Sequence, residues 1–439
     1  MDAVPPPERP IRLVVSDDLE RTRVTVFFRL LLAIPHVIWL LLWSIAAFTV
    51  SFVVWLAVLF ERRAPRTLHN FLASYVRYAT HLSAYLAIAS NPYPSFTGQP
   101  GYPVDVEIDP PRQQGRWGAG FRIVLAVPAL LLAAVLGGGL EGIVSSVPTT
   151  GDADSSYGYG AGIGGVVAVV SVLGWFAAMA RSRMPRGMRD LAAYAIFYAA
   201  QTYGYVLLLT DRYPSADPAL VTPAELPEHP VRVTVTDSLQ RSRLTVFFRL
   251  LLFLPHLVWL LLWSLVVLFV AVISWLVALV VGYVPRPLRR FLAAYVRYLA
   301  HLEAFLYLVG GPFPGFTGAQ GSYPIDVTVE PAERQRRVTV LFRLVLVLPA
   351  GLLAGAYGGV LFVVAVLGWF AGVFTGRMPS GIRDLGAAGI RYSAQTRAYF
   401  LLVTDRYPYS APFLQGTERD EQLELGFAPT PPEPLGEPV

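Results

Sequence analysis

The chain has 439 residues, of which 54% are hydrophobic and only 15% charged, and its formal net charge is +5. A soluble globular domain carries about 25% charged residues, so this composition argues against an ordinary water-soluble protein and favours a membrane protein. Cysteine is absent, which excludes disulfides, thiolate metal sites and cysteine nucleophiles. Residues 1–10 are proline-rich and lack the pattern of a cleavable signal peptide, so insertion is expected to rely on internal segments.

Short segments with alternating β-branched residues, bounded by prolines and acids, recur along the chain. Alternation with a period of two residues predicts β-strands. An isolated strand is not stable in water, so we expect the strands to form one small sheet on the cytoplasmic side. The segments are residues 11–15, 104–108, 231–235 and 325–329.

A long apolar run follows the first strand, from residue 30 to residue 60, and would be roughly 46 Å long as one helix against a hydrocarbon core of about 30 Å. It is either an interfacial start up to Pro35 followed by one long span, or a helical hairpin that turns near Trp43. The second such run contains an insertion at residues 137–165, and the fourth has a loop-like GAYGG at residues 355–359. Insertions are tolerated in loops, and the hairpin places the arginines on one side of the membrane, so the pattern favours the hairpin.

A tyrosine-rich segment closes each part of the chain, at residues 68–89, 191–209, 288–309 and 382–403. Polar residues recur in these segments at helical spacing. An arginine at the bilayer centre costs about 2.5–3.5 kcal/mol, which favours an amphipathic helix at the interface over a buried span with its polar stripe inward. A solvated helix face is the simpler alternative to a binding role. The candidate contacts to lipid phosphate or to a partner are Arg77, His81, Arg297, His301, Arg391 and Gln395.

The two halves of the chain are copies of each other. Residues 25–32 (TVFFRLLL) return unchanged as residues 245–252, and each half holds a diverged second copy that keeps the phenylalanine-arginine frame at residues 121–122 and 342–343. We therefore predict an all-α polytopic membrane protein of four units, each with a transmembrane hairpin, an amphipathic Tyr/Arg-rich helix and one strand. The units are residues 11–102, 103–222, 223–322 and 323–411, between a disordered segment at residues 1–10 and a disordered acidic tail at residues 412–439.

The frame at residues 28–36 (FRLLLAIPH), the basic-proline turns at residues 183–185 and 377–379, and the closing TDRYP at residues 210–214 and 404–408 resemble the bacterial membrane family called domain of unknown function 4389. The resemblance covers nearly the whole chain between residues 11 and 408. It implies a bacterial inner-membrane location and no known activity.

No constellation of residues predicts catalysis. His36 and His256 have no neighbouring carboxylate in sequence, and we find no nucleophile elbow, P-loop or paired acids. We expect no enzymatic activity, cofactor, metal or nucleic-acid partner. The favoured hypothesis is a membrane scaffold or accessory protein with cytoplasmic termini and a cytoplasmic platform that binds lipid or a partner protein. The alternatives are a transporter or channel with a polar path along the Arg/His/Tyr helices, and a lipid-modifying enzyme.

Overall fold

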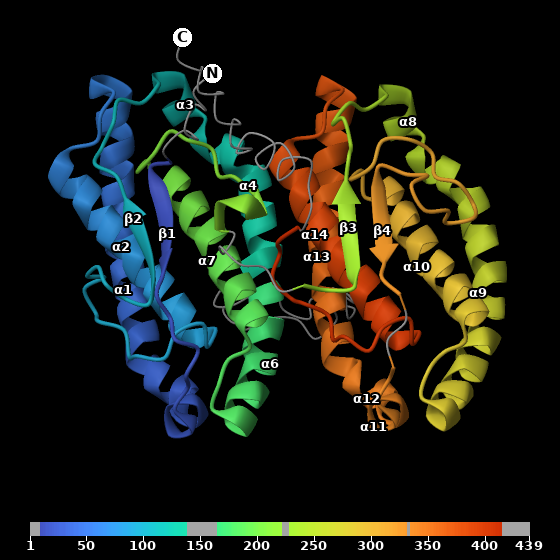
Figure 1. Ribbon diagram of the computed structural model, residues 1–439. Coiled ribbons are helices and arrows are strands. Elements are labelled where there is room, and N and C mark those ends of the chain that lie inside the picture. The colour runs from blue at the N-terminus through green and yellow to red at the C-terminus, as the bar shows by residue number, and fades with distance from the viewer. Residues whose placement is uncertain (1–8, 138–164, 222–227, 332–333, 415–439) are drawn as a thin grey trace, which may run out of the picture.

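The computed structural model describes residues 9–137, 165–221, 228–331 and 334–414. Residues 1–8, residues 138–164 of the predicted insertion at 137–165, and residues 415–439 of the predicted tail at 412–439 lie outside these ranges. The described part is mostly helical, and its two halves stand side by side (Figure 1).

The strands form at the predicted residues but pair as two separate sheets. β1 (Ile11–Val15) pairs with β2 (Val104–Ile108), and β3 (Val231–Val235) pairs with β4 (Ile325–Val329), both antiparallel. The prediction of one sheet is therefore wrong. Each pair packs on helices of its own half. This packing stabilises it, because an isolated two-stranded sheet is only marginally stable in water.

The long apolar runs are continuous helices. α1 (Arg23–Glu61) and α9 (Arg249–Val281) are unbroken, and the run from Arg343 to Thr375 is helical as α12 (Arg343–Leu346) and α13 (Leu348–Thr375). These three are long and apolar enough to cross a membrane. In the second part of the chain, α4 (Arg122–Gly137) and α6 (Val166–Arg181) occupy the equivalent place.

The predicted hairpin is contradicted. α1 continues through Trp43, and α13 continues through the glycine-rich residues 355–359. Each glycine costs a helix only about 1 kcal/mol, whereas an unpaired backbone group in an apolar environment costs several kcal/mol. Helix is therefore the cheaper backbone conformation in these runs, even where the residues resemble those of a loop.

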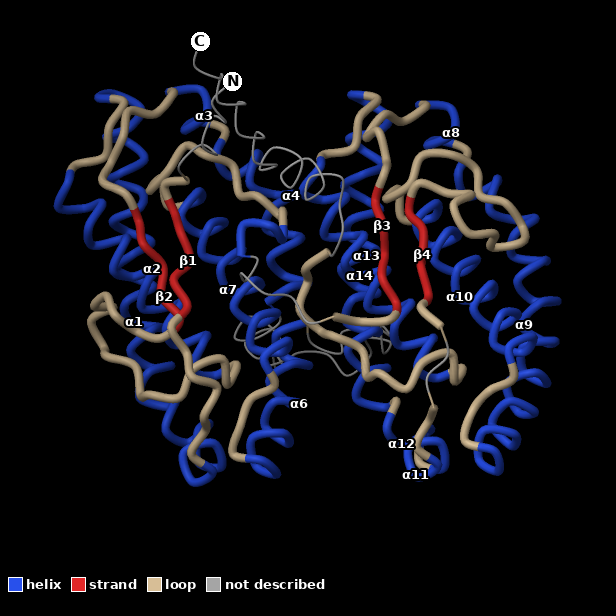
Figure 2. Tube along the Cα trace, in the orientation of Figure 1, coloured by secondary structure: helices blue, strands red, loops and turns tan. Residues whose placement is uncertain are grey.

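The tyrosine-rich segments form four helices of 21 residues each: α2 (Arg66–Leu86), α7 (Arg186–Val206), α10 (Arg286–Leu306) and α14 (Ser380–Phe400). They form a middle layer. The strands pack on one side of them, and α1, α4, α6, α9 and α13 pack on the other. Figure 2 shows both sheets on the same face of the helices. The two halves meet where α13 packs on α4 and α6.

Within the first half, the two parts exchange backbone hydrogen bonds. The loop after β1 accepts a bond at the Leu19 carbonyl from the Met184 N–H at 2.9 Å, in the turn between α6 and α7. In return, the Gln114 N–H before α3 (Arg116–Gly120) donates to the Arg62 carbonyl at 2.8 Å, in the turn between α1 and α2. The second half repeats both bonds, between Met378 and Leu239 and between Gln335 and Gly282. Each half is thus held together as one body.

Gly318 should not tolerate a side chain. Its φ is +59°, and a Cβ there would lie 2.2 Å from the Ala294 carbonyl oxygen of α10. We expect Gly318→Ala to lower the free energy of unfolding by about 2 kcal/mol or more, because backbone strain adds to a clash that no rotamer relieves. Gly315→Ala is the matched control, since nothing lies within 4 Å of its Cβ position. Denaturant titration in detergent micelles measures both variants, and equal stabilities would contradict the prediction.

Candidate functional site

The polar stripe of α2 faces strand β2. His81 Nε2 lies 2.7 Å from Asp105 Oδ1, and Arg77 Nε donates to the Val106 carbonyl at 3.1 Å. Asp105 also accepts a hydrogen bond from the Gly101 N–H at 2.9 Å. Both members of the His81–Asp105 pair are buried. The stripe therefore joins a helix of the middle layer to the sheet.

The second half repeats this arrangement on α10 and β4. His301 Nε2 lies 2.8 Å from Asp326 Oδ1, and Arg297 Nε donates to the Val327 carbonyl at 2.8 Å. The repetition at equivalent residues shows that the same polar contact supports both sheets.

Arg391 and Gln395 extend the stripe on α14. The Gln395 side-chain amide donates to the Val231 carbonyl of β3 at 2.9 Å, and Arg391 donates to the Ala411 carbonyl and, at 3.3 Å, to Gln395 Oε1. Both side chains are buried. In the described structure, all six predicted contact residues are bonded within the protein. Lipid or partner binding by these residues stays a prediction, as does a polar transport path along their helices.

Low pH should weaken the contact between α2 and β2 that the Asp105 carboxylate forms. Burial acts to raise the pKa of this carboxyl, but hydrogen bonds from His81 and from the Gly101 and Val106 N–H groups outweigh it, so the pKa lies below its ordinary value of 3.8. A carboxyl with a lowered folded-state pKa contributes stability above its ordinary pKa, and that contribution is lost as the pH falls through the folded-state pKa. We expect the free energy of unfolding to fall below about pH 4, and Asp105→Asn to remove part of this dependence.

Denaturation at a series of pH values between about 3 and 6 measures this effect. Asp18→Asn is the matched control, because the Asp18 carboxylate is exposed and only accepts a local bond from the Glu20 N–H. A pH dependence that is identical in wild type and Asp105→Asn would contradict a role for this carboxyl.

Four buried arginines form a second set of sites, which the sequence interpretation missed. Each lies at or near the start of an apolar helical run and is at most 3% exposed. Its guanidinium carbon lies 4.1–4.4 Å from the centre of an aromatic ring at the end of a tyrosine-rich helix. They are Arg29, Arg122, Arg249 and Arg343, over Tyr85, Tyr205, Phe305 and Tyr399. The signal was present, since arginine stands in the same frame in each copy at the start of an apolar run.

Three of these arginines donate to a carbonyl in the last turn of a middle-layer helix, and Arg122 donates to the Thr210 carbonyl just beyond the end of α7. Arg343 Nη1 donates to the Tyr399 and Thr404 carbonyls at 2.9 and 3.0 Å, and Nη2 donates to Asp405 Oδ1 at 2.8 Å. Such donors satisfy carbonyls that a helix end leaves free and offset its negative dipole end. Leu402, two residues beyond the end of α14, has a left-handed backbone conformation with a φ of +60°. The hydrogen bonds of Arg343 therefore lie on both sides of a left-handed residue at a position where glycine is more usual.

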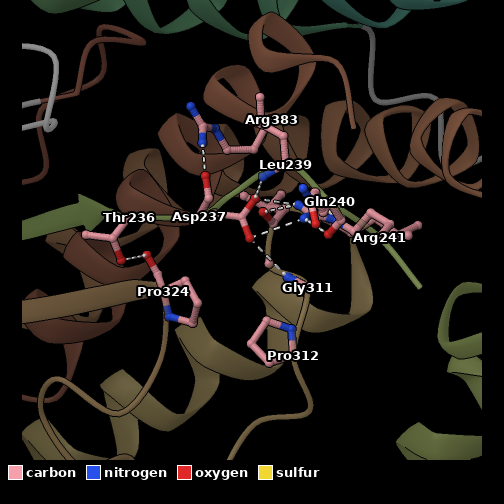
Figure 3. Close-up of polar contacts among 12 residues, drawn as sticks. Thr236, Asp237, Leu239, Gln240, Arg241, Gly311, Pro312, Pro324 and Arg383 are labelled. Atoms are coloured by element: carbon pink, nitrogen blue, oxygen red, sulfur yellow. Dashed lines mark hydrogen bonds and ion pairs between the residues drawn. The ribbon is translucent and has the colours of Figure 1, made fainter. Parts of the chain in front are cut away.

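A buried aspartate fixes the loop that leads from β3 to α8 (Arg243–Phe247). Figure 3 shows the Asp237 carboxylate between the Arg241 guanidinium, the Leu239 N–H and the Gly311 N–H. Asp237 Oδ2 lies 2.8 Å from Arg241 Nη2, and the two side chains are 2% and 0% exposed. Arg383 of α14 donates to the Asp237 carbonyl at 3.1 Å. Asp17 and Arg21 form the same pair in the first half, at 2.8 Å.

Metal chemistry and chemistry at the His81–Asp105 pair both depend on which side chains come together among the residues that the structure describes. No group of three metal-ligating side chains occurs among them. The His81–Asp105 pair resembles part of a catalytic triad, but His81 is 1% exposed and stacks on Tyr102, so a substrate has no access to it. A cavity of about 540 Å³ lies between the halves and is lined by Gln201, Thr210 and Arg212 among others; the described residues of its wall include no histidine or carboxylate.

One family model matches the chain three times, at residues 23–98, 243–315 and 337–412, and its description is Domain of unknown function (DUF4389). No curated protein and no solved structure matches the chain. The segment from Arg116 to residue 214 lies outside the three matches, although it carries the same arginine cap at Arg122.

Proposed function

This chain belongs to the family described as Domain of unknown function (DUF4389), and we propose that it is a non-enzymatic membrane scaffold or accessory protein. Its apolar helices anchor it in lipid, and its polar side presents a platform to anionic lipid headgroups or to a partner protein. We place it in the bacterial inner membrane with the platform and both termini in the cytoplasm. The four units predicted from the sequence are part of the same proposal.

The observation that carries the proposal is the contrast between two faces of the molecule. Apolar side chains of the long helices are widely exposed, for example Leu30 at 75%, Phe48 at 78% and Leu261 at 72%. Contiguous exposed apolar surface of this kind marks a membrane or protein contact. The outer face of the sheets instead carries charged pairs such as Arg12–Glu107. A molecule with one apolar face and one polar face can anchor in lipid and present the polar face to water.

The polar chemistry of the interior is already used for structure. The His–Asp pairs join helices to strands, and the buried arginines cap helices. In the described ranges, these polar groups form hydrogen bonds within the chain that support the fold. This use of the polar groups favours a scaffold over an enzyme.

Exposed arginines at the α1–α2 and α9–α10 turns supply a test of the lipid contact. Arg63, Arg66, Arg286 and Arg290 are exposed and would lie at the membrane surface. In bilayer nanodiscs that mix phosphatidylcholine with phosphatidylglycerol, native mass spectrometry should find phosphatidylglycerol retained on the protein. Changing the four arginines to glutamine should reduce this retention severalfold, whereas changing them to lysine should preserve it, because headgroup attraction needs the charge.

The partner contact is tested by mild detergent extraction from native membranes followed by cross-linking. A protein that retains no anionic lipid and co-isolates with no other protein would contradict the scaffold proposal.

A further inference from the structure

The sheet of the first half lies beside the middle of α1. Tyr75 of α2 hydrogen-bonds Ser44 of α1 through its hydroxyl at 2.9 Å, and two residues later Arg77 donates to Val106 of β2 at 3.1 Å. Ser44 lies close to the midpoint of α1, which runs from residue 23 to residue 61, and Val106 is the central residue of β2. The second half has the same arrangement, with Tyr295 on Ser264 at 2.7 Å and Arg297 on Val327 at 2.8 Å.

The depth of the sheet in the membrane is restricted, because its outer face carries charges and its strands have unpaired edges. Arg12 and Glu107 lie 3.3 Å apart, and their side chains are 44% and 58% exposed. Within the part of the chain that the structure describes, each sheet has two strands, so one edge of each strand has backbone groups without a strand partner. Were α1 to cross the bilayer with its middle at the midplane, this sheet would sit at the same depth. Each charge would then cost about 2.5–3.5 kcal/mol, and open edges do not occur at that depth.

The positions at which α4 ends and α6 begins give the same result. Arg122 and Trp175 correspond to Arg29 and Trp55 of α1, so Gly137 and Val166 fall near the middle of the equivalent helix. The residues between them include Glu141, Asp152 and Asp154. A spanning orientation would start this acid-containing segment at the bilayer midplane.

Exposed arginines flank α1 at both ends, with Arg23 at its start and Arg62 and Arg63 beyond its end. A single span would place these charges on opposite sides of the membrane, against the usual cytoplasmic bias of arginine. A helix lying in the membrane plane places both ends at the same interface. One helix is about 10 Å thick, which fits within a leaflet whose hydrocarbon is about 15 Å deep.

We propose that the long apolar helices lie in the plane of one leaflet and do not cross the bilayer. This inference rests on the proposed membrane location and specifies its geometry. The layer of α1, α4, α6, α9 and α13 is immersed in acyl chains, and the tyrosine-rich helices and the sheets stand above it on one aqueous side. The protein is then a one-sided platform, with the sheets facing water rather than lipid.

Spin labels on the cysteine-free chain measure this geometry directly in reconstituted bilayers. Single cysteines replace Leu31, Ile38, Ile45, Phe52 and Phe60, which follow one face of α1 and are 56–75% exposed. Accessibility to oxygen, compared with accessibility to a water-soluble nickel chelate, reports the depth of each label. Val15→Cys on the sheet is the water-exposed control, at 39% exposure. A second scan on α9, at Leu251, Val258, Leu265 and Val272, guards against a variant that fails to fold.

The proposal predicts a similar depth at every position of a scan, with high oxygen accessibility and low nickel accessibility. A profile that is deepest at Ile45 and about 15 Å shallower at Leu31 and Phe60 would overturn the in-plane geometry and leave the membrane scaffold intact. Labels that are all accessible to the nickel chelate would overturn both the geometry and the proposed membrane location.

Discussion

Arg343→Met is expected to destabilise the protein by about 3–5 kcal/mol. The substitution removes donors from the Tyr399 and Thr404 carbonyls and from the Asp405 carboxylate, at a side chain that is 2% exposed. Buried acceptors left without a donor each cost about 1–3 kcal/mol, and loss of one partner from a buried ion pair costs about 3–5 kcal/mol. Methionine keeps much of the side-chain volume, so the loss reports the polar cap rather than a cavity.

Arg337→Met is the control, because Arg337 is exposed on the preceding helix. We expect it to change the free energy of unfolding by less than about 0.5 kcal/mol. Denaturant titration of both variants in the same detergent compares them. Similar stabilities for the two variants would mean that the buried arginine is not a structural cap.

Asp237→Asn is expected to cost about 3–5 kcal/mol as well. The change leaves the buried Arg241 guanidinium without a carboxylate, and an uncompensated buried charge is strongly destabilising. Because the loop also hydrogen-bonds the turn before α14, we expect the contact between the two parts of this half to loosen. Limited proteolysis should then cut near residue 240 at a protease concentration that spares the wild type.

Asp18→Asn is the matched control, since Asp18 lies in the equivalent loop of the first half but is exposed. Its stability and cleavage pattern should match the wild type. Unchanged cleavage in Asp237→Asn would show that the carboxylate does not fix the loop.

The local elements could be predicted from the sequence because their signals are local. Period-two alternation located β1 to β4, and polar residues at helical spacing located α2, α7, α10 and α14 to within five residues at each end. Strand pairing could not be predicted, because it depends on which helices cover each strand. The hairpin was wrong for a related reason: propensity predicts a loop at residues 355–359, but the apolar surroundings of α13 favour a continuous helix.

The candidate site could be predicted only in part. Arg77 and His81 were correctly placed on one helix face, but their partners, Val106 and Asp105, come from a strand more than twenty residues later, which spacing alone does not reveal. Arg29 belongs to the frame at residues 28–36, but the sequence alone assigns it no role. Its burial over Tyr85 follows from helix packing, so only comparison of the internal copies would have pointed to it.

The central claim, that the polar platform lies on one side of the membrane, is tested most directly by cysteine labelling in intact cells. Ser16 precedes α1 and Thr67 follows it, and both are exposed. An impermeant thiol reagent should label neither Ser16→Cys nor Thr67→Cys until the cells are permeabilised, and should then label both. Labelling of one position and not the other in intact cells would show that α1 crosses the membrane and would contradict the one-sided account.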